Sequence, residues 1–122
     1  MSNTAILINA NDNTISLVSI KDYKDISKFG QFDLFTCVQI DAKGNTLYVD
    51  DEGLLNGTSR GFVIEGYEQP LMGNAVLLGT NLNTGDSKDT SLSLEKVASM
   101  VRCFVRVGRM IVRSADAPKI IA

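Results

Sequence analysis

The densest group of potentially reactive side chains is the acidic run Asp50-Asp51-Glu52. Three adjacent carboxylates could hold a divalent cation through oxygen, or supply the acid and base of a hydrolase. Their spacing is not that of a known cation loop, and such runs are typical of a solvated loop. The chain also has no histidine. We therefore expect no catalytic residue, no metal site and no cofactor, and keep a carboxylate- and metal-dependent hydrolase as an alternative.

A second group combines hydrogen-bond donors with glycine-rich backbone, and this combination is typical of a small anion pocket. The glycines themselves have neither phosphate-loop nor dinucleotide-fold spacing, so they indicate turns. Recognition of a nucleotide needs donors and an arginine for phosphate, plus a ring or apolar wall for the base. The region from Asn56 to Asn74 has all of these, and a neighbouring helix could add arginines. The predicted ligand-binding residues are Asn56, Thr58, Ser59, Arg60, Tyr67, Asn74, Arg102 and Arg106.

Composition places these residues in one compact domain spanning residues 1–122. The chain has 122 residues, 44% of them apolar and 21% charged, as is usual for a single core. Cys37 and Cys103 both lie in apolar surroundings, where thiols usually behave as small buried hydrophobes. No secretory signal or membrane span is apparent. We expect a cytoplasmic protein with no membrane partner.

Charge is distributed unevenly along the chain. Residues 96–122 contain six bases and one acid, a net charge of +5, so the formal total of -2 leaves -7 for residues 1–95. A basic segment thus begins at about residue 101, behind an acidic body. Nucleic acid is an unlikely partner because the arginines lack interleaved aromatics and the body would repel phosphate. An acidic surface at Asp50-Asp51-Glu52 could instead bind a protein partner.

The first half of the chain predicts two hairpins and a short helix. Ala5–Asn9 and Ile15–Ile20 are β-branched runs around a turn-rich segment, and Leu34–Ile40 with Asn45–Val49 repeats this arrangement. Between the hairpins, Lys21–Phe29 has apolar residues at three-residue steps, which favours a helix that Gly30 ends.

The second half predicts a buried strand, a surface loop and a long helix. Ala75–Gly79 is entirely apolar or glycine, and Asn81–Asp89 is polar. Tyr67-Glu68-Gln69-Pro70 is expected to end the ambiguous segment Phe62–Ile64. From Ser91 onward, the spacing of polar residues predicts a helix to about Val107, with the rest unassigned. Those residues lie at intervals of four, three, four, three and four: Glu95, Ser99, Arg102, Arg106, Arg109 and Arg113.

Together these segments predict an α+β fold. We expect a mostly antiparallel sheet of four to five strands, one long C-terminal helix covering one face, and one short helix at an edge. A helix that is apolar on nearly all sides needs more cover than so small a core provides. We therefore expect a homo-oligomer, such as a dimer.

Three segments resemble an uncharacterised family of small phage and plasmid proteins, the domain of unknown function numbered three-eight-four-six: Tyr48–Gly57, Gln69–Gly79 and Thr90–Leu92. The resemblance covers about residues 5–100. Thr58-Ser59-Arg60 departs from it, because the family more often has a Pro-x-Asn arrangement, and the basic segment after Met100 has no counterpart.

The resemblance implies a source and a way of life rather than a reaction. Families of this kind are carried by phages and mobile elements as accessory genes, and their small products often act by binding. The leading hypothesis is a non-enzymatic accessory protein that sequesters a small anionic, nucleotide-like ligand to counter host defence. The alternatives are an inhibitor that binds a host protein through its acidic surface, and the hydrolase described above.

Overall fold

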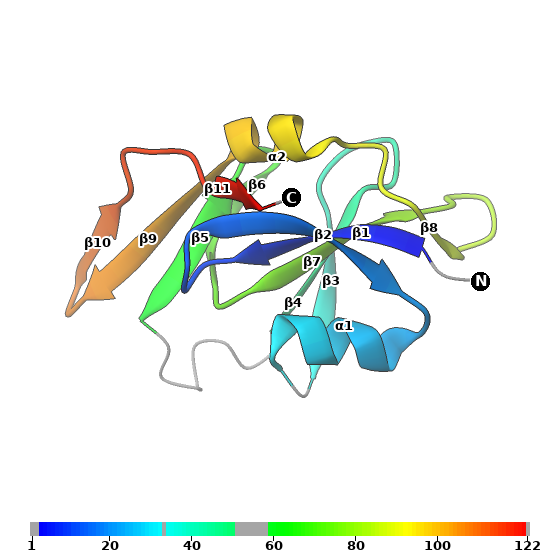
Figure 1. Cartoon of the computed structure of the whole chain (residues 1–122), viewed down its shortest axis with the longest axis horizontal. Helices are drawn as coiled ribbons and strands as arrows, with labels where there is room; N and C mark the ends of the chain where they lie inside the picture. The colour runs from blue at the N-terminus through cyan, green and yellow to red at the C-terminus, as the bar shows by residue number, and fades with distance from the viewer. Residues whose placement is uncertain (1–2, 33, 51–58, 122) are drawn as a thin grey trace.

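The fold is mostly β. A computed structural model describes residues 3–32, 34–50 and 59–121, of which 52% lie in strands and 14% in helices (Figure 1). The described elements are β1 (Asn3–Asn9), β2 (Thr14–Ile20), α1 (Tyr23–Gly30), β3 (Phe35–Gln39), β4 (Thr46–Asp50), β5 (Arg60–Ile64), β6 (Tyr67–Met72), β7 (Ala75–Thr80), β8 (Ser87–Lys88), α2 (Leu94–Met100), β9 (Val101–Val107), β10 (Met110–Arg113) and β11 (Lys119–Ile121).

The strands form two sheets. The large sheet has the order β11-β2-β1-β7-β4-β3, with β8 paired to β7, and the small sheet has the order β10-β9-β5-β6. Described neighbours are antiparallel, except that β11 runs parallel to β2. The two predicted hairpins, β1–β2 and β3–β4, are confirmed, as is the buried strand at β7. The prediction of one sheet with four to five strands is wrong.

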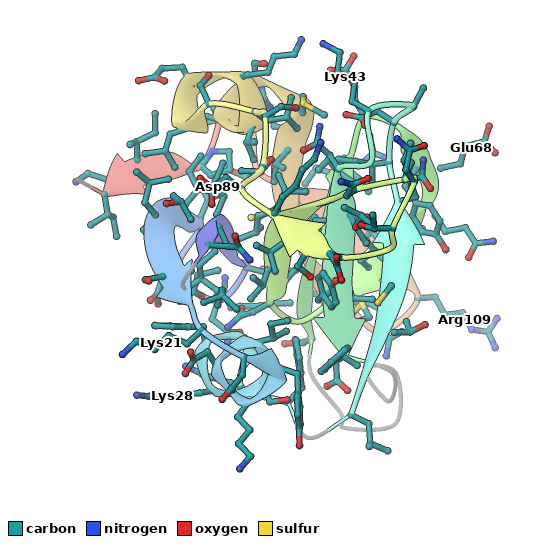
Figure 2. The ribbon with its side chains drawn as sticks, turned by 90° about the vertical axis from the view of Figure 1, so that its right-hand side faces the viewer. Lys21, Lys28, Lys43, Glu68, Asp89 and Arg109 are labelled. Carbon is teal, nitrogen blue, oxygen red and sulfur yellow. The ribbon has the colours of Figure 1, made fainter. Side chains whose placement is uncertain are left out.

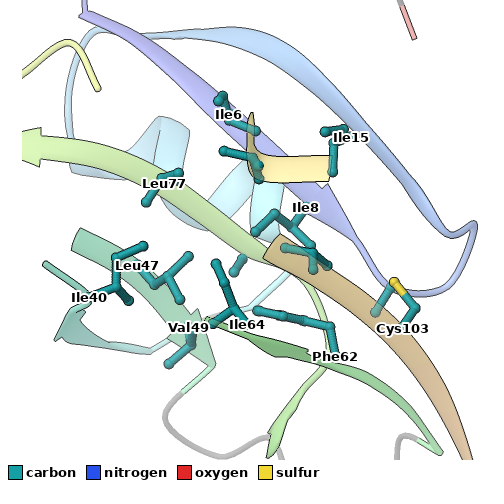
Figure 3. Close-up of a cluster of buried hydrophobic side chains, with 14 of the residues drawn as sticks. Ile6, Ile8, Ile15, Ile40, Leu47, Val49, Phe62, Ile64, Leu77 and Cys103 are labelled. Carbon is teal, nitrogen blue, oxygen red and sulfur yellow. The ribbon is translucent and has the colours of Figure 1, made fainter. Parts of the chain in front are cut away.

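The main core lies between the two sheets (Figure 3). Alternate residues of the large sheet, such as Ile6, Ile8 and Leu77, face Phe62 and Ile64 of the small sheet. Helix α2 adds Val97 and Ala98 to this core and contacts β2, β9 and β11. Because side chains alternate across a strand, the other residues of the large sheet must be covered elsewhere.

Helix α1 provides that second cover. Its Ile26 joins Ala5, Val76 and Leu78 in a separate buried cluster, so β7 is buried on both faces. The helix begins after Asp22, whose side chain accepts from Lys24 N. Gly30 is its last residue, as expected, and the left-handed cap conformation is adopted by the next residue, Gln31. The helix therefore packs across the face of the large sheet, and the prediction that it lies at an edge is wrong.

The predicted long C-terminal helix is absent. Helix α2 ends at Met100, and residues 101–107 and 110–113 form the β9–β10 hairpin. Val101 and Cys103 pair with Ile64 and Phe62 and point into the core. The valines of residues 101–107 favour a strand. As strand β9, this segment pairs with β5 and buries alternate side chains in the core.

The turn of the β9–β10 hairpin also explains why the arginine spacing misled. In one continuous strand, Arg102 and Arg106 would lie on one face and Arg113 on the opposite face, because side chains alternate. This argument holds only if the strand has no turn. The two-residue turn at Gly108 and Arg109, where Gly108 has φ 60°, reverses the chain between Val107 and Met110. Arg113 then pairs with Phe104 and returns to the face that carries Arg102 and Arg106.

Two further expectations are corrected. Tyr67-Glu68-Gln69-Pro70 does not end an element but begins β6, where Pro70 is tolerated because β6 is the last strand of the small sheet. The predicted loop at residues 81–89 is exposed except at Asn81, but it contains the short strand β8. Across the described ranges, no helix has the length and apolar character needed to cross a membrane.

Candidate functional site

A cavity of about 250 Å³ lies where the β1–β2 turn approaches the small sheet. Its wall comes from Ala10 and Asn13 in the turn, Arg60 at the start of β5, residues 103–105 of β9, and residues 112–114 at the end of β10. We call this cavity the Arg60 pocket. The pocket brings together residues from both ends of the sequence. Strands β9 and β10 lie at the end of the molecule opposite β8 (Figure 1).

Strand alternation places Arg60 on the inner face of the small sheet. Phe62 points into the core, and Arg60 is two residues earlier on the same face, opposite Val105. Arg60 itself is exposed. Its guanidinium therefore sits where the apolar core opens to solvent, beside the partly buried Val105.

Cys103 lies next to this arginine but is not a reactive thiol. Burial raises the pKa of Cys103 to about 11, and the positive charge of Arg60 offsets only part of that increase. The thiol is therefore neutral near pH 7, whereas the thiolate is the nucleophilic form. Cys37 is exposed on β3, which contradicts the expectation that both thiols are buried.

Asn13 gives the pocket a hydrogen-bond acceptor. Its backbone is left-handed, with φ 55°, and its carbonyl accepts from Lys119 N at 2.9 Å. The side-chain Nδ2 lies 3.5 Å from Ser114 Oγ. The Oδ1 atom is buried and has no hydrogen-bond partner within the described ranges. An unpaired buried acceptor costs about 1–3 kcal/mol, so an N–H or O–H of a ligand in the pocket would be favoured.

The pocket thus combines a cation, a polar side chain and apolar walls. The described residues include no cluster of three or more metal-ligating side chains. Asp51 and Glu52 lie outside the described residues, so the acidic run retains the status of a sequence prediction.

The predicted ligand-binding residues are not gathered around one site. Asn56 and Thr58 lie outside the described residues. Tyr67 pairs with Ile64, four residues from Arg60 along β5, which separates them by roughly 13 Å. Asn74 is buried, and its Oδ1 accepts from Ala10 N at 3.0 Å. Asn74 therefore anchors the β1–β2 turn through a backbone contact and does not line the Arg60 pocket.

The two predicted arginines of the C-terminal segment also act elsewhere. The guanidinium of Arg102 donates to Ala98 O at 3.1 Å and Val101 O at 2.7 Å, which satisfies carbonyls at the end of α2. Arg106 is exposed on the outer face of β9, and its N–H donates to the carbonyl of Ser59 at 2.6 Å. Of the predicted residues that the structure describes, only Arg60 lines the pocket.

Sequence reasoning missed Asn13, Cys103 and Ser114 as pocket residues. A signal for Asn13 was present, because asparagine in a turn between two strands often adopts the left-handed conformation and has its side chain fixed there. Ser114 had no such signal, since its position depends on the reversal of β10.

Comparisons of this chain with models of protein families, with curated proteins and with solved structures found no match. The resemblance to the uncharacterised phage and plasmid family therefore stays a prediction.

Proposed function

We propose that this chain binds a small anionic ligand in the Arg60 pocket without transforming it. The observation that supports the proposal is that Arg60 and Asn13 line one cavity and that the buried Oδ1 of Asn13 has no hydrogen-bond partner within the described ranges. A guanidinium pairs well with phosphate or carboxylate, and the asparagine oxygen accepts from a hydroxyl or amine. Both groups are complementary to a ligand that carries an acid and a nearby donor.

The size of the cavity limits the ligand. At about 250 Å³, the pocket lies just below the range of about 300–1,000 Å³ usual for drug-sized ligands. A mononucleotide-like molecule with one end outside the pocket fits this limit better than a dinucleotide. Its phosphate would contact Arg60, a sugar hydroxyl would donate to Asn13, and its base would lie against Val105 and Val112.

The biological role that we propose is sequestration of such a signal in the cytoplasm of a host cell by a phage or mobile-element accessory protein. Support for this role comes from the family resemblance and from the absence of an activated nucleophile at the pocket, where Cys103 is held neutral. A binder that withdraws a signal needs affinity but no turnover.

Titration calorimetry at low salt with inorganic phosphate and a panel of linear and cyclic mononucleotides tests the binding. Arg60→Met removes the charge but keeps an apolar stem, and Arg109→Met makes the same charge change at the exposed hairpin turn. A hydrogen bond to a charged group is worth about 1.5–3 kcal/mol, so Arg60→Met should weaken binding roughly 10- to 150-fold. Arg109→Met should leave it unchanged. Equal losses in both variants would mean diffuse charge attraction and would refute the site.

The hydrolase alternative is tested with the same ligands. The protein is incubated with magnesium or manganese, and products are separated by chromatography. Intact ligand after prolonged incubation is the expected result. If the wild-type protein forms product and the Asp51→Asn variant does not, the function is hydrolysis rather than binding.

A further inference from the structure

Strand β10 is an edge of the small sheet, and no other strand of the described residues pairs with its outer side. It is the last strand in the order β10-β9-β5-β6, and all four of its residues are exposed. The opposite edge strand, β6, contains Pro70, which lacks an N–H and so discourages pairing with another strand. Strand β10 has no proline and continues in regular register with β9 from Met110 to Arg113.

The register shows which backbone groups of β10 face outward. Ser114 N donates to Cys103 O at 2.8 Å, and bonded pairs alternate along an antiparallel ladder. Val112 and Met110 therefore bond to Val105 and Val107, whereas the N–H and C=O groups of Ile111 and Arg113 point away from β9. A strand placed alongside β10 would meet two donors and two acceptors at the correct spacing.

The two faces of this edge differ in chemistry. On the inner face, Met110 and Val112 are 67% and 52% exposed, and Val107 beside them is 61% exposed. On the outer face, Arg113 and Ile111 lie beside Phe104 and Arg106 of β9. Arg109 projects from the turn, away from the body of the molecule (Figure 2). From Val101 to Arg113 the chain has four arginines and no acidic residue.

We propose that β10 captures an extended segment of a partner protein whose side chains alternate between apolar and acidic. When such a segment pairs with β10, its apolar side chains lie beside Met110 and Val112, and its acidic side chains lie beside Arg113. Charge argues against a second copy of this chain as the occupant. Pairing of β10 with β10 would bring Arg109 and Arg113 of both copies together, and like charges on adjacent strands repel.

A fluorescent peptide of alternating valine and glutamate tests the proposal by anisotropy at low salt. Two control peptides are used, one with lysine in place of glutamate and one with the same residues in two blocks. The alternating acidic peptide should bind at least tenfold more tightly than either control. Arg60→Met, which weakens anion binding in the pocket, should leave peptide binding unchanged, so that failure of one proposal is distinguishable from failure of the other.

Ile111→Pro removes an outward N–H without breaking a bond of the β9–β10 hairpin, and Ile111→Ala keeps that N–H while removing the side chain. With circular dichroism showing both variants folded, Ile111→Pro should lose peptide binding at least tenfold, whereas Ile111→Ala should retain it within a few-fold. Equal binding by the two variants would overturn strand addition.

Amide hydrogen exchange gives a readout that does not depend on a variant. The amides of Ile111 and Arg113 should exchange quickly in the free protein and slowly with the peptide bound, while the amide of Val112 is protected in both. Binding without this protection, or no binding, would refute the proposal. Protection that grows with protein concentration alone would identify a second copy of the chain as the occupant instead.

Discussion

Asn45 links two parts of the fold that are distant in sequence, and its replacement has calculable consequences. The side chain is 1% exposed. Its Nδ2 donates to Asp41 Oδ2 at 2.7 Å and to Ser91 Oγ at 2.9 Å, and its Oδ1 accepts from Thr90 Oγ1 at 2.7 Å and from Ser91 N at 3.2 Å. Every donor and acceptor of the amide is therefore used, and the turn before β4 is tied to the segment that leads into α2.

Asn45→Ala removes these four bonds. At about 1 kcal/mol for each bond, the free energy of unfolding should fall by at most about 4 kcal/mol. Ser91 is exposed, so water can replace some of these bonds, and we expect a loss of about 2–4 kcal/mol. Burial raises the pKa of Asp41, but hydrogen bonds from Asn45 and Lys43 outweigh it and hold the pKa below its ordinary value. In Asn45→Ala the pKa of Asp41 should therefore rise.

Asn45→Asp has nearly the same shape but replaces the donor by an oxygen 2.7 Å from Asp41 Oδ2. Two carboxylates at that distance share a proton, so the pair has a raised pKa in the folded state. The folded state then binds more protons than the unfolded state, and stability falls as pH rises from about 4 through the raised pKa. The wild-type protein behaves in the opposite way, because the lowered pKa of Asp41 contributes stability that is lost only on acidification.

Urea unfolding at about pH 4.5 and pH 7.5, above the ordinary aspartate pKa, measures this difference. The free energy of unfolding of Asn45→Asp should lie about 3–5 kcal/mol below that of the wild type at the higher pH, as for an uncompensated buried charge. The deficit should shrink at the lower pH. Titration by nuclear magnetic resonance follows Asp41 in Asn45→Ala. A deficit that is the same at both pH values, or larger in acid, would refute the proton-sharing argument.

Three other predictions follow from burial. Leu77→Ala should cost about 3–5 kcal/mol in urea unfolding, because Leu77 is fully buried, whereas Leu17→Ala should change stability by less than about 0.5 kcal/mol, because Leu17 is 56% exposed. Alkylation followed by mass spectrometry should label Cys37 in the folded protein and Cys103 only after unfolding. Burial raises the pKa of Cys103 to about 11, so the free energy of unfolding should fall between about pH 9 and pH 11. Cys103→Ala should reduce that fall. The same fall in the variant would show that Cys103 is not its cause.

The sequence predicted those strands whose own pattern is sufficient evidence. Strand β7 is apolar throughout because both of its faces are covered, and the β1–β2 hairpin has β-branched runs around a turn. The C-terminal half of the predicted helix failed for a different reason. A spacing of four residues, as between Arg102 and Arg106, returns to the same face in a strand as well as in a helix. The valines and Gly108 carried the better signal, because they disfavour a helix and permit a hairpin.

The candidate site was less accessible to sequence reasoning than the fold. Arg60, which lines the pocket, was among the predicted residues because a cation near glycines and donors is conspicuous in a sequence. Its partners on the pocket wall depend on the β1–β2 turn meeting the end of β10, a contact between residues separated by about a hundred positions, as in the approach of Asn13 to Ser114. Local propensity has no information about such a contact, because tertiary packing decides it.

The apolar character of the predicted C-terminal helix led to the expectation of a homo-oligomer, and the structure removes that basis. Residues 101–113 form a hairpin instead of a helix, yet Val107, Met110 and Val112 are exposed. As residues of an edge strand they present open backbone groups as well as apolar side chains, so any occupant must be extended rather than helical. The surrounding arginines then favour an acidic segment over a copy of the same basic strand. In this way the charge asymmetry of the sequence, rather than its hydrophobicity, determines which kind of partner β10 accepts.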